Sequence, residues 1–105
     1  MNICAIAGRL VKNAVVRGSE RKVLLFTIAA QWGADENGSK DRATHIPCLV
    51  FSPSEDLERS LVQNGQGTYI ELEGRILTSS YDTKGERKFT TEVVAFNRSI
   101  TLLKN

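Results

Sequence analysis

The sequence has very little of what metal centres, membrane spans and secretion signals require. Its 105 residues include one histidine and two cysteines, Cys4 and Cys48, which are too far apart to show a zinc-ligand spacing. No apolar run approaches the ~20 residues of a membrane-spanning helix. The N-terminus lacks the basic region ahead of an apolar one that marks a signal peptide. We therefore expect a cytoplasmic protein with no metal, no cofactor and no membrane partner.

Both cysteines lie among apolar neighbours in stretches of β character. The sequence is compatible with a disulfide between them and with two free thiols. Because the other features indicate a reducing cytoplasm, two buried free thiols are the favoured interpretation.

Motifs for catalysis are missing as well. The single histidine, His45, has no nucleophile motif to act on. Neither a Gly-x-x-x-x-Gly-Lys-Ser/Thr phosphate loop nor a Gly-x-Gly-x-x-Gly turn occurs. Neighbouring carboxylates such as Glu71 and Glu73 are common on solvated surfaces. We expect that the protein is not an enzyme.

The composition is that of one ordinary globular domain spanning residues 1–105. Apolar residues make up 41% of the chain and charged residues 25%, which excludes wholesale disorder. The net charge is only +2, so any basic surface must arise from where the cations are placed. A chain of this length buries a limited share of its surface and often gains stability by association.

Short β-type segments dominate the pattern, and Pro47 marks a strand edge or a bulge in one of them. In residues 67–81, Ile70, Leu72 and Ile76 alternate with polar residues, which is the two-residue period of a half-buried strand. A charged, glycine-containing loop is expected over residues 33–42. The five expected strands cover residues 2–12, 23–32, 43–51, 67–81 and 87–97.

One helix is expected between the third and fourth strands. Ser52 is a suitable N-cap, and Glu55 completes a Ser-x-x-Glu capping box with it. Leu57 and Leu61 then share one helix face, and Gly65 offers a stop. Three strands, one helix and two strands form the layout of an OB fold, a five-stranded all-β barrel. A sandwich would need about seven strands.

Aromatic and cationic side chains near the strand ends suit the binding of single-stranded nucleic acid, which needs base-stacking surfaces and phosphate contacts. Phe51 and Phe89 are equally suited to the core, and the basic turn after residue 83 is also compatible with an ordinary solvated hairpin tip. Phe26 alternates with core residues, so we expect it to be buried. The candidate stacking residues are Trp32, His45, Phe51 and Tyr81, and the candidate phosphate contacts are Arg9, Lys40, Arg42, Arg75, Lys84, Arg87 and Lys88.

Several motifs resemble the DNA-binding core of the bacterial single-stranded DNA-binding protein family over almost the whole chain. The most specific are residues 67–76, GTYIELEGRI, and residues 90–94, TTEVV, at the right separation. Weaker matches are IAGRL at residues 6–10, FTIA at residues 26–29 and LVF at residues 49–51.

This resemblance implies a binding site built on a few aromatic positions. Phe51 matches one of them, and Tyr81 lies where the family commonly has a tryptophan. His45 lies where another tryptophan is usual, and Trp32 is two residues early for a third. The family forms homo-oligomers, commonly tetramers and sometimes dimers, so we expect the first strand and residues 96–103 to contribute to association.

The resemblance also bears on the role. Family members that serve chromosomal replication usually continue into a flexible linker and an acidic tail, whereas this sequence ends shortly after the last expected strand. It therefore resembles a tail-less member, such as a plasmid, phage or mobile-element version or the primosomal replication protein N. A truncated piece of a longer protein is the other interpretation.

The function implied is sequence-tolerant binding and protection of single-stranded DNA in DNA replication, recombination or repair, at the nucleoid. Two alternatives keep the fold. One is a replication-restart (primosome) adaptor whose main partners are other replication proteins, and the other is an RNA-binding OB module.

Overall fold

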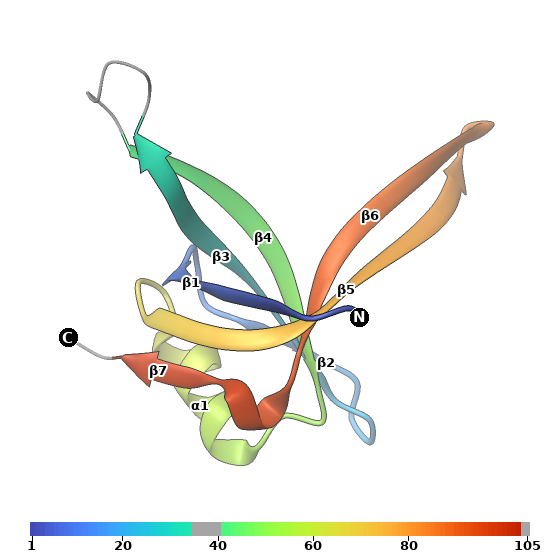
Figure 1. Cartoon of the computed structure of the whole chain (residues 1–105). Coiled ribbons are helices and arrows are strands. Elements are labelled where there is room, and N and C mark those ends of the chain that lie inside the picture. Colours follow the sequence, from blue (N-terminus) through green and yellow to red (C-terminus); the bar gives the residue numbers. More distant parts are fainter. Residues whose placement is uncertain (35–40, 104–105) are drawn as a thin grey trace.

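The computed structural model describes residues 1–34 and 41–103 of the chain. In this part of the chain one α-helix and seven strands occur (Figure 1). No helix in these ranges is long and apolar enough to cross a membrane. The elements are β1 (Cys4–Leu10), β2 (Val15–Arg17), β3 (Val23–Ala34), β4 (Asp41–Phe51), α1 (Glu55–Asn64), β5 (Tyr69–Thr83), β6 (Glu86–Ala95), the 3-10 turn η1 (Asn97–Ser99) and β7 (Thr101–Leu103).

Five of the strands close into a barrel. The hydrogen-bonded order runs β1-β3-β4-β6-β5, and β5 pairs back onto β1. All these pairings are antiparallel except β4 with β6, which run parallel through Cys48–Val93 and Leu49–Val94. The short strands β2 and β7 add to the edges of β3 and β5. The expected OB-fold barrel with one helix between its third and fourth strands is confirmed, with two short strands in addition.

Two long hairpins rise from the barrel as arms, one made by β3 and β4 and the other by β5 and β6 (Figure 1). The β5–β6 arm turns at Lys84 and Gly85, which both have positive φ, at 50° and 79°. Positive φ at both central residues is the requirement of the tight hairpin turn that matches strand twist. The β3–β4 arm extends further than the sequence indicated. Strand pairing reaches Ala34 and Asp41, inside the loop expected at residues 33–42, with a bulge between Gln31 and Gly33.

The expected helix start was wrong by two residues. Ser54, not Ser52, is the N-cap, and its hydroxyl accepts the Leu57 N–H at 3.2 Å. Ser52 has a φ of 50°, and its N–H donates to the Lys22 carbonyl at 2.9 Å. Ser52 therefore forms a left-handed turn directly after β4, and the helix begins at Glu55.

The core fills the barrel, and α1 closes one end of it. Leu57 and Leu61 are buried, as their spacing predicted, and Ala14 N–H donates to the Leu61 carbonyl at 2.9 Å. Phe26 is buried, as expected. Where β1 crosses β3, Gly8 lies so close to Ala29 that a Cβ would collide with the Ala29 carbonyl oxygen. The crossing therefore needs a glycine there.

Both cysteines are free thiols, and they differ in burial. Burial raises the pKa of the Cys48 thiol from 9.0 to about 12, with the nearby Cys4 as a second cause. Because folding raises the pKa of Cys48, its protonated thiol contributes to the stability of the fold at pH values below 9.0. This contribution is lost as the pH rises from 9.0 through about 12.

We expect Cys48 to resist a thiol reagent at pH 8 while the protein is folded, because the reactive thiolate is suppressed. Labelling followed by mass spectrometry should show modification of Cys4 before Cys48, with both thiols reacting in denaturant. Reaction of Cys48 at the same rate in the folded and denatured protein would contradict its burial.

Candidate nucleic-acid interface

The strand register determines which candidates share a face. On β4, His45 and Phe51 point to the outer face of the barrel, because they alternate with Cys48 and Val50, which are buried in the core. His45 is exposed, and Phe51 has 50% of its surface exposed. Leu49 lies between them on the same outer face. The sequence placed His45 and Phe51 on one face, and the structure shows that this face is the outer one.

The β5–β6 arm carries a second set of candidates on its outer face. Arg75 lies opposite Val94, and Tyr81 lies opposite Lys88. Residues directly opposite in an antiparallel pair project to the same side, and so do residues at even spacing along one strand. Arg75, Tyr81 and Lys88 therefore share one face of the arm. The Tyr81 ring is 52% exposed.

The parallel contact between β4 and β6 joins the two sets. Leu49, from the outer face of β4, is the register partner of Val94, from the outer face of β6. The outer faces of β4, β6 and β5 are therefore one continuous surface, which we call the aromatic face. Its members are His45, Phe51, Arg75, Tyr81 and Lys88.

Arg9 extends this surface across the barrel. It pairs with Ala29 on one side and Tyr69 on the other, and Ala29 pairs in turn with His45. The Arg9 guanidinium lies 5.7 Å from the centre of the Tyr69 ring and donates to the Gly67 carbonyl at 3.0 Å. These contacts fix the cation in place. The outward side chains thus form one row, which joins the aromatic face at His45. It runs through Tyr69, Arg9, Ala29 and His45.

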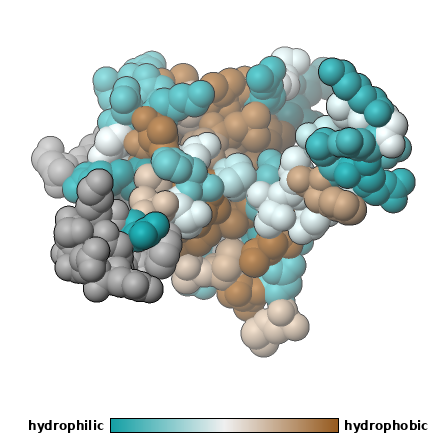
Figure 2. All heavy atoms as spheres, turned by 90° about the horizontal axis from the view of Figure 1, so that it is seen from above, coloured by the Kyte–Doolittle hydropathy of each residue, from teal (hydrophilic) through white to brown (hydrophobic). Residues whose placement is uncertain are grey.

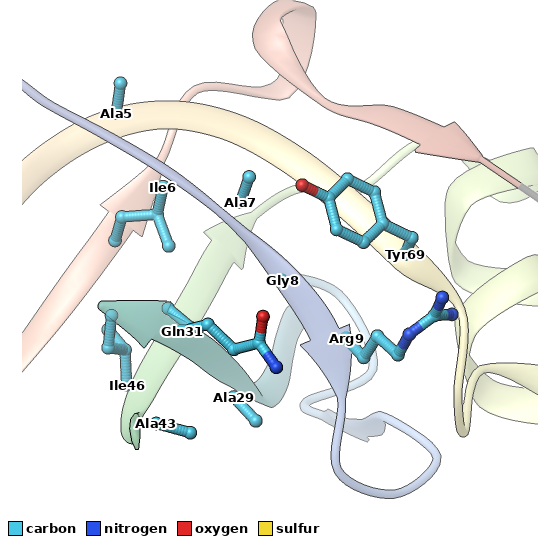
Figure 3. A pocket seen from close by; sticks show the side chains of 11 residues that line it. Ala5, Ile6, Ala7, Gly8, Arg9, Ala29, Gln31, Ala43, Ile46 and Tyr69 are labelled. Carbon is cyan, nitrogen blue, oxygen red and sulfur yellow. The ribbon is translucent and has the colours of Figure 1, made fainter. Parts of the chain in front are cut away.

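A trough lies beside this row, where β1 turns away from β3 (Figure 3). Arg9, Gln31 and Tyr69 lie around it, and small side chains such as Ala29 and Ala43 line it. Small residues leave room for a flat group. Glu71 and Glu73 follow Tyr69 on the same face of β5, where they pair with Ala7 and Ala5 of β1, and both are exposed. Their negative charges disfavour an anionic group on that side.

The expected basic cluster at the β5–β6 turn is split by the register. Arg87 lies opposite Asp82, on the other face of the arm from Tyr81, and the two form an ion pair at 3.5 Å. Lys88 lies beside Tyr81 and pairs with Glu86 at 3.0 Å. Lys84 is at the tip of the turn. Exposed ion pairs are worth little, so each cation remains available to a phosphate.

The remaining candidates belong to the β3–β4 arm. Arg42 is exposed and pairs with Gly33 at the far end of β4. Lys40 lies outside the described residues, and so does the side chain of Trp32. The structure therefore places Arg42 on this arm and leaves the other two as expectations.

Tyr69 is an aromatic candidate that the sequence argument missed. It is half-buried and begins β5 on the same strand face as Arg75 and Tyr81. Extending the two-residue period of β5 back to its first residue would have found it. No group of three metal-ligating side chains occurs in residues 1–34 and 41–103.

A closed barrel with a parallel contact between its third and last strands defines a protein with an OB fold, which commonly binds oligonucleotides through one face. A solved structure described as the Plasmodium falciparum SSB complex with single-stranded DNA has a similar fold. Its TM-score is 0.77, at 18% identity, over 98% of this chain and 93% of that chain.

Sequence comparison then gives the family. The sequence model of the single-strand binding protein family matches residues 1–101, and the chain belongs to this family. It is 32% identical over 99 residues to a single-stranded DNA-binding protein of Clostridium tetani, covering 90% of this chain and 66% of that protein. It is 33% identical to single-stranded DNA-binding protein 2 of Listeria innocua, covering 60% of that relative. The chain thus spans about two thirds of the length of such relatives.

Membership of a binding-protein family agrees with the expectation that the chain is not an enzyme.

Proposed function

We propose that residues 1–105 form one binding domain that holds and protects single-stranded DNA with little sequence preference, in DNA replication, recombination or repair. The observation that carries this proposal is the continuous aromatic face, where exposed rings and cations lie together across three strands. The names of the relatives, which are single-stranded DNA-binding proteins, support the choice of ligand.

The chemistry favours an unpaired strand. A ring such as Phe51 or Tyr81 can stack on any base, at about 1–3 kcal/mol per base, but only where the face of that base is free. Bases in a duplex are already stacked on each other. Arg75, Lys88 and Arg9 would neutralise phosphates between the stacked bases.

The other candidate residues are expected to contribute less to binding. His45 would stack beside the small Ala29, and Trp32, Lys40 and Arg42 would meet the strand along the β3–β4 arm. Lys84 and Arg87 would contact phosphate only where the strand passes over the tip of the β5–β6 arm.

A binding titration separates the candidate functions. We expect a fluorescently labelled single-stranded DNA to bind more tightly than a duplex of the same sequence, with weaker binding as salt rises. Measurements at two salt concentrations with single-stranded DNA, single-stranded RNA and duplex would show it. Tighter binding of RNA would favour the RNA-binding alternative. Weak binding of all three, with retention of replication proteins in a pull-down, would favour the adaptor.

We also propose that the chain associates with copies of itself, as a dimer or a tetramer. In the described part of the chain, β1 pairs with β3 only at Arg9 and Leu10, so one edge of its remaining residues is unpaired. An open strand edge is a template for another strand. Apolar side chains also gather between the two arms (Figure 2), and Ile3 and Ile76 are among the exposed apolar residues.

Light scattering tests the association. We expect a mass two or four times the 11.6 kDa of one chain. A mass of one chain at all concentrations would contradict it. The segment β7, which pairs with β5 and exposes Leu103, is the second expected contributor.

A further inference from the structure

A pocket lies on the outer side of the barrel beside Phe51, at the end of the aromatic face away from the arm tips. Phe51 and Arg75 line it, and so do Phe96 and Arg98, which are not among the candidate binding residues above. Phe96 follows β6 and has 42% of its surface exposed, and Arg98 belongs to η1. The pocket thus combines two exposed rings with two arginines.

Hydrogen bonds hold these elements together. The Asn97 side-chain amide donates to the Phe51 carbonyl at 2.9 Å and to the Ser52 carbonyl at 3.3 Å. The Phe96 N–H donates to the Glu73 carbonyl at 2.9 Å. These bonds tie η1 to the end of β4 and to β5. The backbone of Phe96 is therefore held against the barrel by these hydrogen bonds.

The strand register brings the two rings side by side. In the parallel pair, Leu49 lies opposite Val94. Phe51, the last residue of β4, and Phe96, the residue after β6, each lie two positions beyond this pair. The backbone of Phe96 is extended, so both lie on the outer face. Both line one pocket, and Val94 lines it as well. Two exposed aromatic rings at one pocket form a surface on which an unpaired base can stack.

The charges of the pocket suit a phosphate. Arg75 and Arg98 are exposed, and neither forms an ion pair with any residue in the described ranges. Among the residues that the structure describes, no carboxylate lines the pocket. Arginine suits phosphate because its planar guanidinium can donate two parallel hydrogen bonds. Two uncompensated arginines beside two rings therefore match the two parts of a nucleotide, its base and its phosphate.

We propose that Phe96 and Arg98, together with Phe51 and Arg75, form a further subsite that binds one nucleotide of the same single strand. The inference rests on the proposed function and extends it, because the strand then continues past Phe51 onto η1. Phe96 stacks the base, Arg98 contacts its phosphate, and Asn97 positions both by fixing η1 on β4.

Truncation of these side chains tests the subsite. We expect Phe96→Ala to weaken binding of a long single strand about ten-fold, the loss of roughly 1.4 kcal/mol of stacking. Arg98→Ala should lower the dependence of log K on log salt by about 0.7, the share of one phosphate on a single strand. The matched control is Phe89→Ala, an aromatic truncation on the opposite face of β6, where the ring is 67% exposed.

Length dependence distinguishes this subsite from the rest of the site. Binding is measured for single strands of increasing length. We expect the affinity of the unsubstituted protein to rise once the strand is long enough to reach the subsite, and the affinity of Phe96→Ala to show no such rise. Equal binding of every length by the parent, Phe96→Ala and Arg98→Ala would overturn the subsite while leaving the proposed function intact. Failure of the parent to bind single-stranded DNA at all would overturn both.

A spectroscopic variant keeps the test independent of changes in affinity. In a Trp32→Phe background, Phe96→Trp provides a single tryptophan at the subsite. We expect its fluorescence to be quenched by a long single strand, because tryptophan also stacks on bases. An unchanged emission at saturation would exclude a stacked base at this position.

Discussion

Replacing Phe51 and Tyr81 together with alanine is expected to weaken binding of single-stranded DNA about 100-fold, since each ring contributes roughly 1.4 kcal/mol or more of stacking. Each single replacement should cost about ten-fold. The two rings are half-exposed and lie on the same face, on different elements, so both are open to the strand. Fluorescence anisotropy with a labelled oligonucleotide measures the change.

The salt dependence gives this experiment an internal check. Neither replacement removes a cation, so the slope of log K against log salt should stay that of the parent. Because both side chains are exposed, the thermal unfolding temperature should also change little. A double variant that binds as tightly as the parent would show that the aromatic face is not the site.

Truncating Leu61 to alanine is expected to destabilise the fold by about 2–5 kcal/mol, the usual cost of removing a buried leucine side chain. Leu61 is fully buried on α1, and its carbonyl accepts a hydrogen bond from Ala14 N–H. The helix therefore closes the end of the barrel through this residue. Chemical denaturation, followed by circular dichroism, measures the change.

The matched control is Leu103→Ala, since Leu103 is 47% exposed on the short strand β7. The same chemical change there should alter the free energy of unfolding by far less in a single chain. Equal effects of the two replacements would contradict the place of α1 as the closing element.

Much of the barrel could be predicted because its signals are local. Alternation around Ile70 and Leu72 indicated β5, and the four-residue spacing of Leu57 and Leu61 indicated the buried side of α1. The start of the helix was missed because Ser52 and Ser54 are both good caps. The choice between them depends on the left-handed turn of Ser52, which is fixed by contact with the distant Lys22.

The candidate site was predictable only within each strand. The alternation of side chains along a strand placed His45 on the same face as Phe51, and Arg75 on the same face as Tyr81. This alternation carries no information about which strands are neighbours. The parallel contact between β4 and β6, far apart in sequence, is what joins these pairs. For the same reason the sequence did not indicate that Phe96 lies beside Phe51, or that Arg87 and Tyr81 lie on opposite faces of the arm. Both placements depend on which residues of neighbouring strands are paired.

The most direct measurement places a single tryptophan on the aromatic face. In a Trp32→Phe background, Tyr81→Trp leaves one tryptophan in the chain, on the exposed outer face of the β5–β6 arm. We expect single-stranded DNA to quench its fluorescence to a saturating level, with a duplex of the same sequence quenching far less. An emission unchanged by single-stranded DNA, or equally quenched by duplex, would contradict the proposal that unpaired bases stack on this face.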